Sequence, residues 1–134
     1  MPRIVRVLNY SGFPISRDVK RKIEEKIGDQ AVAGQRIRVV DIDNTHLDYH
    51  KDMVQHAMNL VEQAHLGTAE QAYIIVPGFS VLAAHLLAVI HGATGRFPLV
   101  IWLSKDAAGA FTEPHYTQLD TLREDVHKST HANH

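Results

Sequence analysis

Four short polar segments hold the residues of this 134-residue chain that have the chemistry to bind a ligand. Each segment follows an apolar run rich in β-branched residues, as expected at the end of a strand. The carboxyl ends of parallel strands lie along one edge of a sheet, and this edge is where open α/β sheets bind their ligands. The predicted ligand-binding residues are Asn9, Tyr10, Ser11, Gly12, Asp43, Asn44, Pro77, Gly78, Phe79, Ser80, Ser104 and Lys105.

The segment Pro77–Ser80 is the most informative of the four. Gly78 allows a ligand to approach the backbone closely. Ser80 occupies an expected N-cap position, and the free N–H groups at a helix start attract phosphate. An anion cradle built from the Gly78–Val81 backbone and the Ser80 hydroxyl is one interpretation, and an ordinary turn with a capping serine is the simpler one. The chain has no GxGxxG or GxxxxGK[ST] motif, so we expect no dinucleotide cofactor and no nucleoside-triphosphate motor.

Two histidines have a spacing that would suit a metal. His46 and His50 are four residues apart, near Asp43, Asp48 and Asp52. Imidazole and carboxylate groups on one helix face can hold a divalent cation. However, acidic residues are also favoured at a helix start by the dipole, which explains this cluster without a metal. We therefore predict no metal site.

The elements that position these residues alternate along the chain. Strands are predicted at 4–8, 37–42, 72–76 and 99–103. Helices are predicted from Ser16 to Gly28, over 48–65, over 81–91, and after a capping Thr112 with Tyr116, Leu119, Leu122 and Val126 on one face. This βαβαβαβα order predicts a single α/β domain over 1–134, with a parallel sheet, helices on both faces and a frayed tail at 129–134.

The helix predicted at 81–91 is apolar on every side. A helix of this kind is buried on more than one side. One side is expected to meet the sheet, and the other to meet a second subunit in a homodimer or higher homo-oligomer. Burial under neighbouring helices of the same chain is the alternative. We interpret Met53, Met58 and Trp102 as packing residues.

Composition limits the classes of function further. Net charge is −1, 45% of the residues are hydrophobic and cysteine is absent, which fits a cytoplasmic protein. The longest apolar run, 81–90, is too short to cross a bilayer. Residues 1–40 carry nine Lys or Arg against four acids, which we interpret as a solvated basic helix face. We expect no membrane and no duplex nucleic acid as partner, and this charge distribution is compatible with a small anionic ligand.

Two motifs together resemble a known family. Leu8-Asn9-Tyr10-Ser11, followed by Pro14, resembles a Leu-Asn-Phe-Ser-x-Pro opening. The run from Val76 to Gly92, with Phe97-Pro98 after it, is similar to a Pro-Gly-x-Ser … Leu-Leu-Ala-x-x-His-Gly … Phe-Pro pattern. Both motifs are typical of small accessory proteins encoded beside type III CRISPR systems. The resemblance covers the first strand and roughly residues 75–103, and Gly12-Phe13-Pro14 replaces the usual His-Pro of the opening.

The resemblance implies a Rossmann-like domain related to CARF domains, which sense cyclic oligoadenylate. The implied ligand is this second messenger, with cyclic tetra-adenylate as the expected ring, and no cofactor is implied. Binding would lower the free level of the messenger by mass action. In an alternative, the chain is a metal-independent ring nuclease, with Ser11, Ser80 and Lys105 as catalytic candidates and His85 or His91 as a remote acid or base. A third hypothesis is a non-catalytic protein-interaction module that docks through the helix at 81–91.

Overall fold

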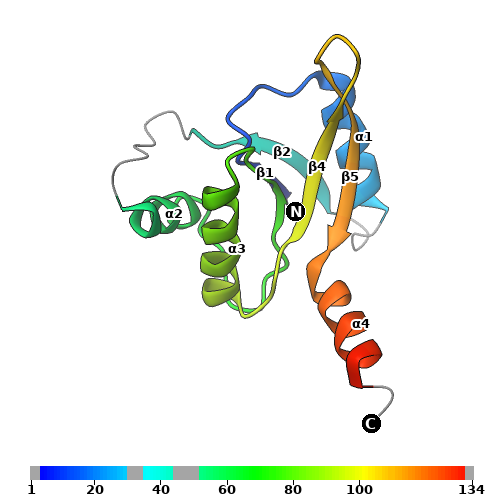
Figure 1. Ribbon diagram of the computed structural model, residues 1–134. Helices are drawn as coiled ribbons and strands as arrows, with labels where there is room; N and C mark the ends of the chain where they lie inside the picture. The colour runs from blue at the N-terminus through cyan, green and yellow to red at the C-terminus, as the bar shows by residue number, and fades with distance from the viewer. Residues whose placement is uncertain (1–3, 30–34, 44–51, 132–134) are drawn as a thin grey trace.

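The computed structural model describes residues 4–29, 35–43 and 52–131. Within them the chain forms five strands and four helices (Figure 1). In chain order these are β1 (Ile4–Asn9), α1 (Arg17–Gly28), β2 (Arg36–Asp41), α2 (Met53–Glu62), β3 (Tyr73–Ile75), α3 (Ser80–Thr94), β4 (Leu99–Lys105), β5 (Phe111–Gln118) and α4 (Leu119–His131).

The strands form one sheet in the order β2-β1-β3-β4-β5. Strands β1 to β4 run parallel, and β5 is antiparallel to β4 at the edge. The predicted α/β class is confirmed, and the sheet is mostly parallel. None of the described helices combines the length and the apolar character needed to span a bilayer.

Apolar side chains build a core on each face of the sheet. On one face, α1 contributes Val19, Ile23 and Ile27 at intervals of four residues, as predicted. The N-cap prediction for this helix is also confirmed, since the Ser16 hydroxyl accepts a hydrogen bond from the Val19 N–H over 3.3 Å. On the other face, α2 and α3 pack side by side, and the buried side chains of α3 are Leu82, Leu86, Ile90 and Thr94.

The fifth strand corrects the sequence prediction. Thr112 caps no helix: Phe111–Gln118 pairs with β4 as an antiparallel strand, and the order is βαβαβαββα. A tight turn returns the chain, with Asp106 Oδ1 accepting hydrogen bonds from the N–H groups of Ala108 and Ala110, and with Gly109 at φ 84°. Such a turn needs an Asx-type acceptor and a residue that tolerates positive φ, and this turn supplies both.

Helix α3 differs from its prediction at both ends. It begins at Ser80 with Phe79 as N-cap, so Ser80 is the first helical residue and does not cap the helix. It also runs through Gly92 to Thr94 and stops at Gly95, whose φ of 80° lies in the left-handed region. The helix therefore continues for two residues beyond the predicted glycine stop.

Two of the residues interpreted as packing are exposed. Trp102 retains 44% of its accessible surface and Met58 retains 48%, whereas Met53 is partly buried. The packing interpretation fails for Trp102, which belongs to neither of the two core clusters. It fails for Met58 because that side chain lies on the outer face of α2. The exposed position of Trp102 has direct consequences for the site.

Candidate functional site

A cavity of about 230 Å³ lies at the carboxyl ends of β1, β3 and β4. We call it the strand-end cavity. It brings together four of the predicted ligand-binding residues, Ser11, Pro77, Gly78 and Lys105. The rest of its lining is apolar and aromatic, made by Phe13, Ile75, Val76, Trp102, Leu103 and Phe111. The edge of the sheet that the sequence indicates therefore carries a concave surface with one cation.

A projecting hairpin forms one wall of this cavity. The pairing of β3 with β4 ends at Ile75 and Ile101, whereas β4 stays paired with β5 out to Lys105 and Phe111. The outer parts of β4 and β5 thus stand beyond the end of β3 as a two-stranded ribbon (Figure 1). Lys105 Nζ lies 5.1 Å from the centre of the Phe111 ring, at cation–π distance.

Two residues of this hairpin, Trp102 and His115, were not among the ligand-binding residues predicted from the sequence. The Trp102 and His115 rings stack, with centroids 5.4 Å apart and an interplanar angle of 20°. His115 Nε2 is also hydrogen-bonded to the Ser104 hydroxyl, which holds the imidazole in place. The missing signal was the strand β5: once Phe111–Gln118 pairs with β4, His115 is the cross-strand partner of Trp102.

Asn9 positions the loop that borders the cavity. Its side chain is 2% exposed. Its Nδ2 group donates to the Phe13 carbonyl over 3.0 Å and to Asp41 Oδ1 over 2.9 Å. Its Oδ1 accepts from the Ser11 N–H over 3.0 Å and from the Ser11 hydroxyl over 2.6 Å. These bonds, with Gly12 at φ 81°, fix the turn and present Ser11 at the cavity.

The Tyr10 side chain lies in the core, away from the strand-end surface. It is 0% exposed, and its hydroxyl donates to the Leu60 carbonyl over 3.1 Å. Burial raises the pKa of Tyr10 to about 12, with a small opposing effect from the charge of Arg6. Only the Tyr10 backbone takes part in the strand end, where its N–H donates to the Ile75 carbonyl over 3.0 Å.

A second cavity of about 290 Å³ adjoins the first, and Phe13 borders both. Asp43 lines it, together with Asn9 and Gly12. Asn44, His46 and His50 lie outside the described residues, so the structure says nothing of the predicted role of Asn44 or of a metal between the two histidines. Within residues 4–29, 35–43 and 52–131, no three His, Cys, Asp or Glu side chains form a group able to hold a metal ion.

The start of α3 is open to a ligand. Phe79 caps it without a side-chain hydrogen bond, and the first bond of the helix runs from the Ala83 N–H to the Phe79 carbonyl over 3.0 Å. The amide groups of the first turn have no acceptor within the helix. A Cβ atom placed on Gly78 would meet nothing within 4 Å. Gly78 and the exposed Ser80 therefore leave the backbone of this turn accessible from the cavity side.

The remaining predicted residues lie in different places. Ser104 faces His115, as described above. His85 Nδ1 lies 2.8 Å from the Val81 carbonyl of its own helix. His91 packs on Phe97 with ring centroids 4.3 Å apart, near the other end of α3. At about 1.5 Å per residue, His91 is roughly 16 Å from Ser80 along the helix axis, so the structure separates it from the strand-end cavity.

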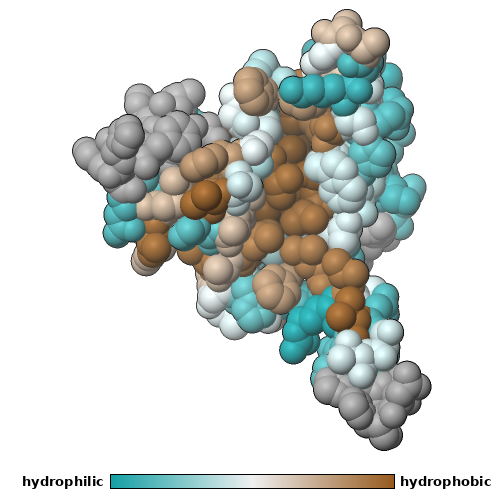
Figure 2. Space-filling model, viewed as in Figure 1, coloured by the Kyte–Doolittle hydropathy of each residue, from teal (hydrophilic) through white to brown (hydrophobic). Residues whose placement is uncertain are grey.

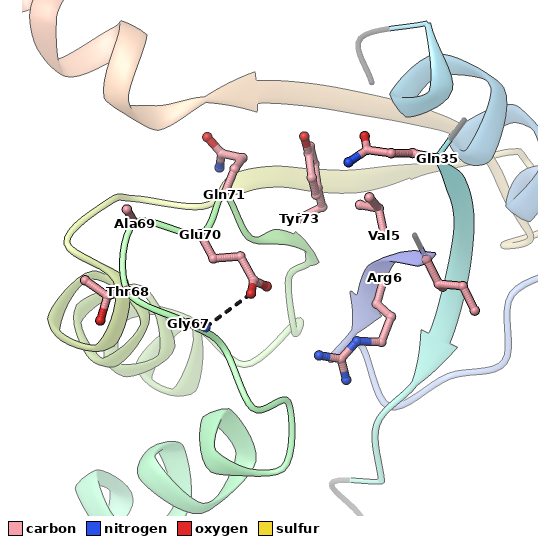
Figure 3. A pocket seen from close by; sticks show the side chains of 10 residues that line it. Val5, Arg6, Gln35, Gly67, Thr68, Ala69, Glu70, Gln71 and Tyr73 are labelled. Atoms are coloured by element: carbon pink, nitrogen blue, oxygen red, sulfur yellow. Dashed lines mark hydrogen bonds between the residues drawn. The ribbon is translucent and has the colours of Figure 1, made fainter. Parts of the chain in front are cut away.

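Another cavity lies at the opposite edge of the sheet, where β1 and β3 begin. It holds about 540 Å³ and is lined by Arg6, Gln35, Glu70, Gln71 and Tyr73, among others (Figure 3). Arg6 donates to the Ala64 carbonyl, and Glu70 Oε1 accepts from the Gly67 N–H over 3.2 Å. These side chains are bonded to the backbone that connects α2 to β3. We therefore assign them the task of holding this connection, which contains the positive-φ residue Ala69.

The fold and the strand-end cavity define an α/β domain with a mixed aromatic and cationic pocket at the carboxyl edge of a mostly parallel sheet. No protein-family model, no curated protein and no solved structure matches the chain.

Proposed function

We propose that the chain binds a cyclic oligoadenylate, with cyclic tetra-adenylate as the first ring to test, and thereby lowers its free concentration. One observation carries the proposal: the strand-end cavity combines the Lys105 ammonium, the Ser11 hydroxyl and the exposed Trp102 ring. A nucleotide presents a phosphate, ribose hydroxyls and a planar base, which these three groups complement. The identity of the ring rests on the resemblance of the Leu8–Pro14 and Val76–Gly92 motifs to accessory proteins of type III CRISPR systems.

The arrangement of the elements supports the same proposal. Strands β1, β3 and β4 are parallel neighbours, with helices on both faces. Their carboxyl ends meet at the cavity, as in a Rossmann-like domain. The open first turn of α3 adds N–H groups that favour a phosphate close to Gly78.

The size of the cavity favours more than one protomer per ring. About 230 Å³ is below the roughly 300–1,000 Å³ of sites that enclose a drug-sized ligand. In this proposal one chain holds a single nucleotide unit, and a twofold homodimer would offer the same cavity to a second unit of a symmetric ring. The homo-oligomer expected from the sequence is, in this proposal, a twofold dimer in which each protomer binds one part of the ligand.

The test is direct titration of the purified protein with cyclic tetra-adenylate in a calorimeter, with the three- and six-membered rings and linear tetra-adenylate as comparisons. We expect saturable binding of one ring size and weak binding of the linear form. Chromatography of the same mixtures over time separates retained intact ring from linear product. The proposal fails if none of the rings binds.

A ring nuclease is the second candidate, and the contact between Ser104 and His115 favours it. In this reaction a ribose 2′-hydroxyl attacks the adjacent phosphorus, the bond to the 5′-oxygen breaks, and a 2′,3′-cyclic phosphate and a 5′-hydroxyl form. A base takes the 2′ proton, and an acid protonates the 5′ oxygen. His115, which stacks on the cavity-lining Trp102, is the candidate for one of these tasks, while Ser11, Ser80 and Lys105 remain the candidates for stabilising the phosphate. If the wild type forms more than one equivalent of linear product and His115→Gln forms none, the protein is an enzyme.

An interaction module is the third candidate. Figure 2 shows hydrophobic surface between α3 and the β4–β5 hairpin that reaches the beginning of α4. Val81, Leu122 and Val126 are 45%, 48% and 55% exposed. The homodimer described above would cover this surface. If size-exclusion chromatography finds a monomer and no ring binds, an unrelated protein partner becomes the better explanation.

A further inference from the structure

The exposed tryptophan of the hairpin is the feature of the molecule whose chemistry the sequence motifs leave unassigned. We infer that Trp102 is the base-stacking residue of the strand-end cavity, with His115 fixed behind it as the second layer of the stack. The inference rests on the proposed function, because it names the part of a nucleotide ligand that this residue contacts. It predicts that the site selects its ligand through a nucleobase as well as through phosphate.

The position of Trp102 is the first argument. Val100, two residues earlier on the same face of β4, is 9% exposed, whereas Trp102 is 44% exposed and lines the cavity. An indole ring is one of the largest apolar surfaces that a side chain can bury. Leaving it open at the mouth of a cavity forgoes that stabilisation, unless a ligand covers the ring.

The second argument is that the indole of Trp102 is held in place before any ligand binds. His115 stacks on one side of it at 5.4 Å, and the Ser104 hydroxyl anchors His115. Both partners come from the paired part of the β4–β5 ribbon. A platform that is fixed before binding loses little conformational entropy when a base stacks on it.

The third argument is the distribution of the other groups around the cavity. Lys105 is three residues further along β4 and lines the same space, so a cation and an aromatic ring face one ligand. Gly78 also lines it and carries no side chain, and the position of a Cβ there is open. A flat base can therefore enter beside the Gly78 backbone while a phosphate stays near Lys105. An acidic or purely aliphatic ligand would leave one of these groups unused.

Trp102 is the chain's single tryptophan, so fluorescence excited selectively at the tryptophan band, outside the absorption of the four tyrosines, reports on this residue alone. We would titrate the full chain with cyclic tetra-adenylate, adenosine 5′-monophosphate, ribose 5-phosphate and inorganic phosphate. The two adenine compounds should quench the emission and saturate, and the two phosphates without a base should leave it unchanged. Calorimetry on the same solutions supplies the affinities.

Variants separate stacking from folding. Trp102→Ala should weaken cyclic tetra-adenylate binding by about 10-fold to 100-fold, as removal of one base-stacking contact usually does. Trp102→Phe keeps an aromatic face and should recover most of the affinity. Met58→Ala removes an apolar side chain of similar exposure from α2 and should bind as the wild type does.

The outcomes distinguish this inference from the proposed function. Binding of cyclic tetra-adenylate without quenching, and with equal affinity in Trp102→Ala, overturns the stacking role and leaves the proposed function intact. Quenching by adenosine 5′-monophosphate without binding of any ring supports the stacking role and overturns the proposed ligand. If Trp102→Ala changes the oligomeric state of the protein but keeps its affinity for the ligand, the indole of Trp102 lies in a subunit interface. That outcome also overturns the inference.

Discussion

Asn9 and Tyr10 follow each other at the end of β1, and both are predicted ligand-binding residues with buried side chains. Their types suit a polar site, but the sequence does not tell in which direction each side chain points. The chain of hydrogen bonds from Asn9 to Ser11, Phe13 and Asp41 uses its amide inside the loop. Tyr10 points into the core instead. At this scale the structure places the predicted segment beside the strand-end cavity and divides it into one residue that faces the cavity, Ser11, and two whose side chains are buried.

Tyr10 makes a prediction about stability at alkaline pH. Its pKa is about 12 in the folded protein, against 10.0 for a solvated tyrosine. The neutral form is favoured in the folded state, so Tyr10 adds no pH dependence below about pH 10, and the free energy of unfolding falls as pH rises from about 10 to about 12. Between about pH 9 and pH 11, the wild type should lose roughly 1 kcal/mol relative to Tyr10→Phe.

Urea denaturation of both proteins at the two pH values checks this. Comparison with Tyr10→Phe cancels the titration of other groups, which both proteins share. The variant also loses the bond to the Leu60 carbonyl, so a constant offset of about 1 kcal/mol at both pH values is expected. The advantage of the wild type should therefore shrink between the two pH values. An advantage that stays the same at both would show that the Tyr10 hydroxyl ionises as readily as in water.

Gly78 belongs to the element scale, because its effect depends on the turn between β3 and α3. Gly78→Val should weaken ligand binding at least 10-fold, since the new side chain occupies the open space beside the cavity. The melting temperature should change little, because a Cβ there meets nothing within 4 Å and the backbone φ is not in the left-handed region. Calorimetry and thermal denaturation measure the two quantities.

Gly92 provides the matched control for this variant. It lies in α3, a Cβ there also meets nothing within 4 Å, and it is remote from the strand ends. Gly92→Val should therefore leave ligand affinity at the wild-type value. Equal affinities of Gly78→Val and the wild type would remove the Gly78 backbone from the site.

The helices and strands differ in how well they could be predicted from the sequence. The strands β1 to β4 and the helix α1 follow from apolar runs and from the four-residue spacing of Val19, Ile23 and Ile27. The strand β5 could not be predicted in this way. Tyr116 in β5 and Leu119 and Leu122 in α4 have helical spacing, and this spacing runs across the boundary between the two elements. Local periodicity cannot tell where a helix begins inside such a run, and the pairing with β4 decides it. Trp102 and His115 could not be assigned to the site without that strand.

The whole molecule leaves apolar side chains open on one side. The α4 helix extends away from the sheet (Figure 1). Its Leu122 and Val126 side chains are exposed. A helix of 13 residues is marginal without tertiary packing. Leu86, in contrast, is 0% exposed within its own chain, so a substitution there tests folding and not assembly. The expected homo-oligomer is therefore better tested on α4 than on the inner face of α3.

Leu122→Glu should convert a homodimer to a monomer, because it places a charge in the surface that the second copy would cover. The protein should stay folded, since the Leu122 side chain is 48% exposed. Thr121→Glu adds the same charge to an exposed neighbour on a different side of α4 and should leave the oligomer unchanged. Light scattering after size-exclusion chromatography gives the mass of each variant, and circular dichroism verifies folding. A wild-type protein that elutes as a monomer at all concentrations would exclude the dimer, and the strand-end cavity of one chain would then have to hold its ligand alone.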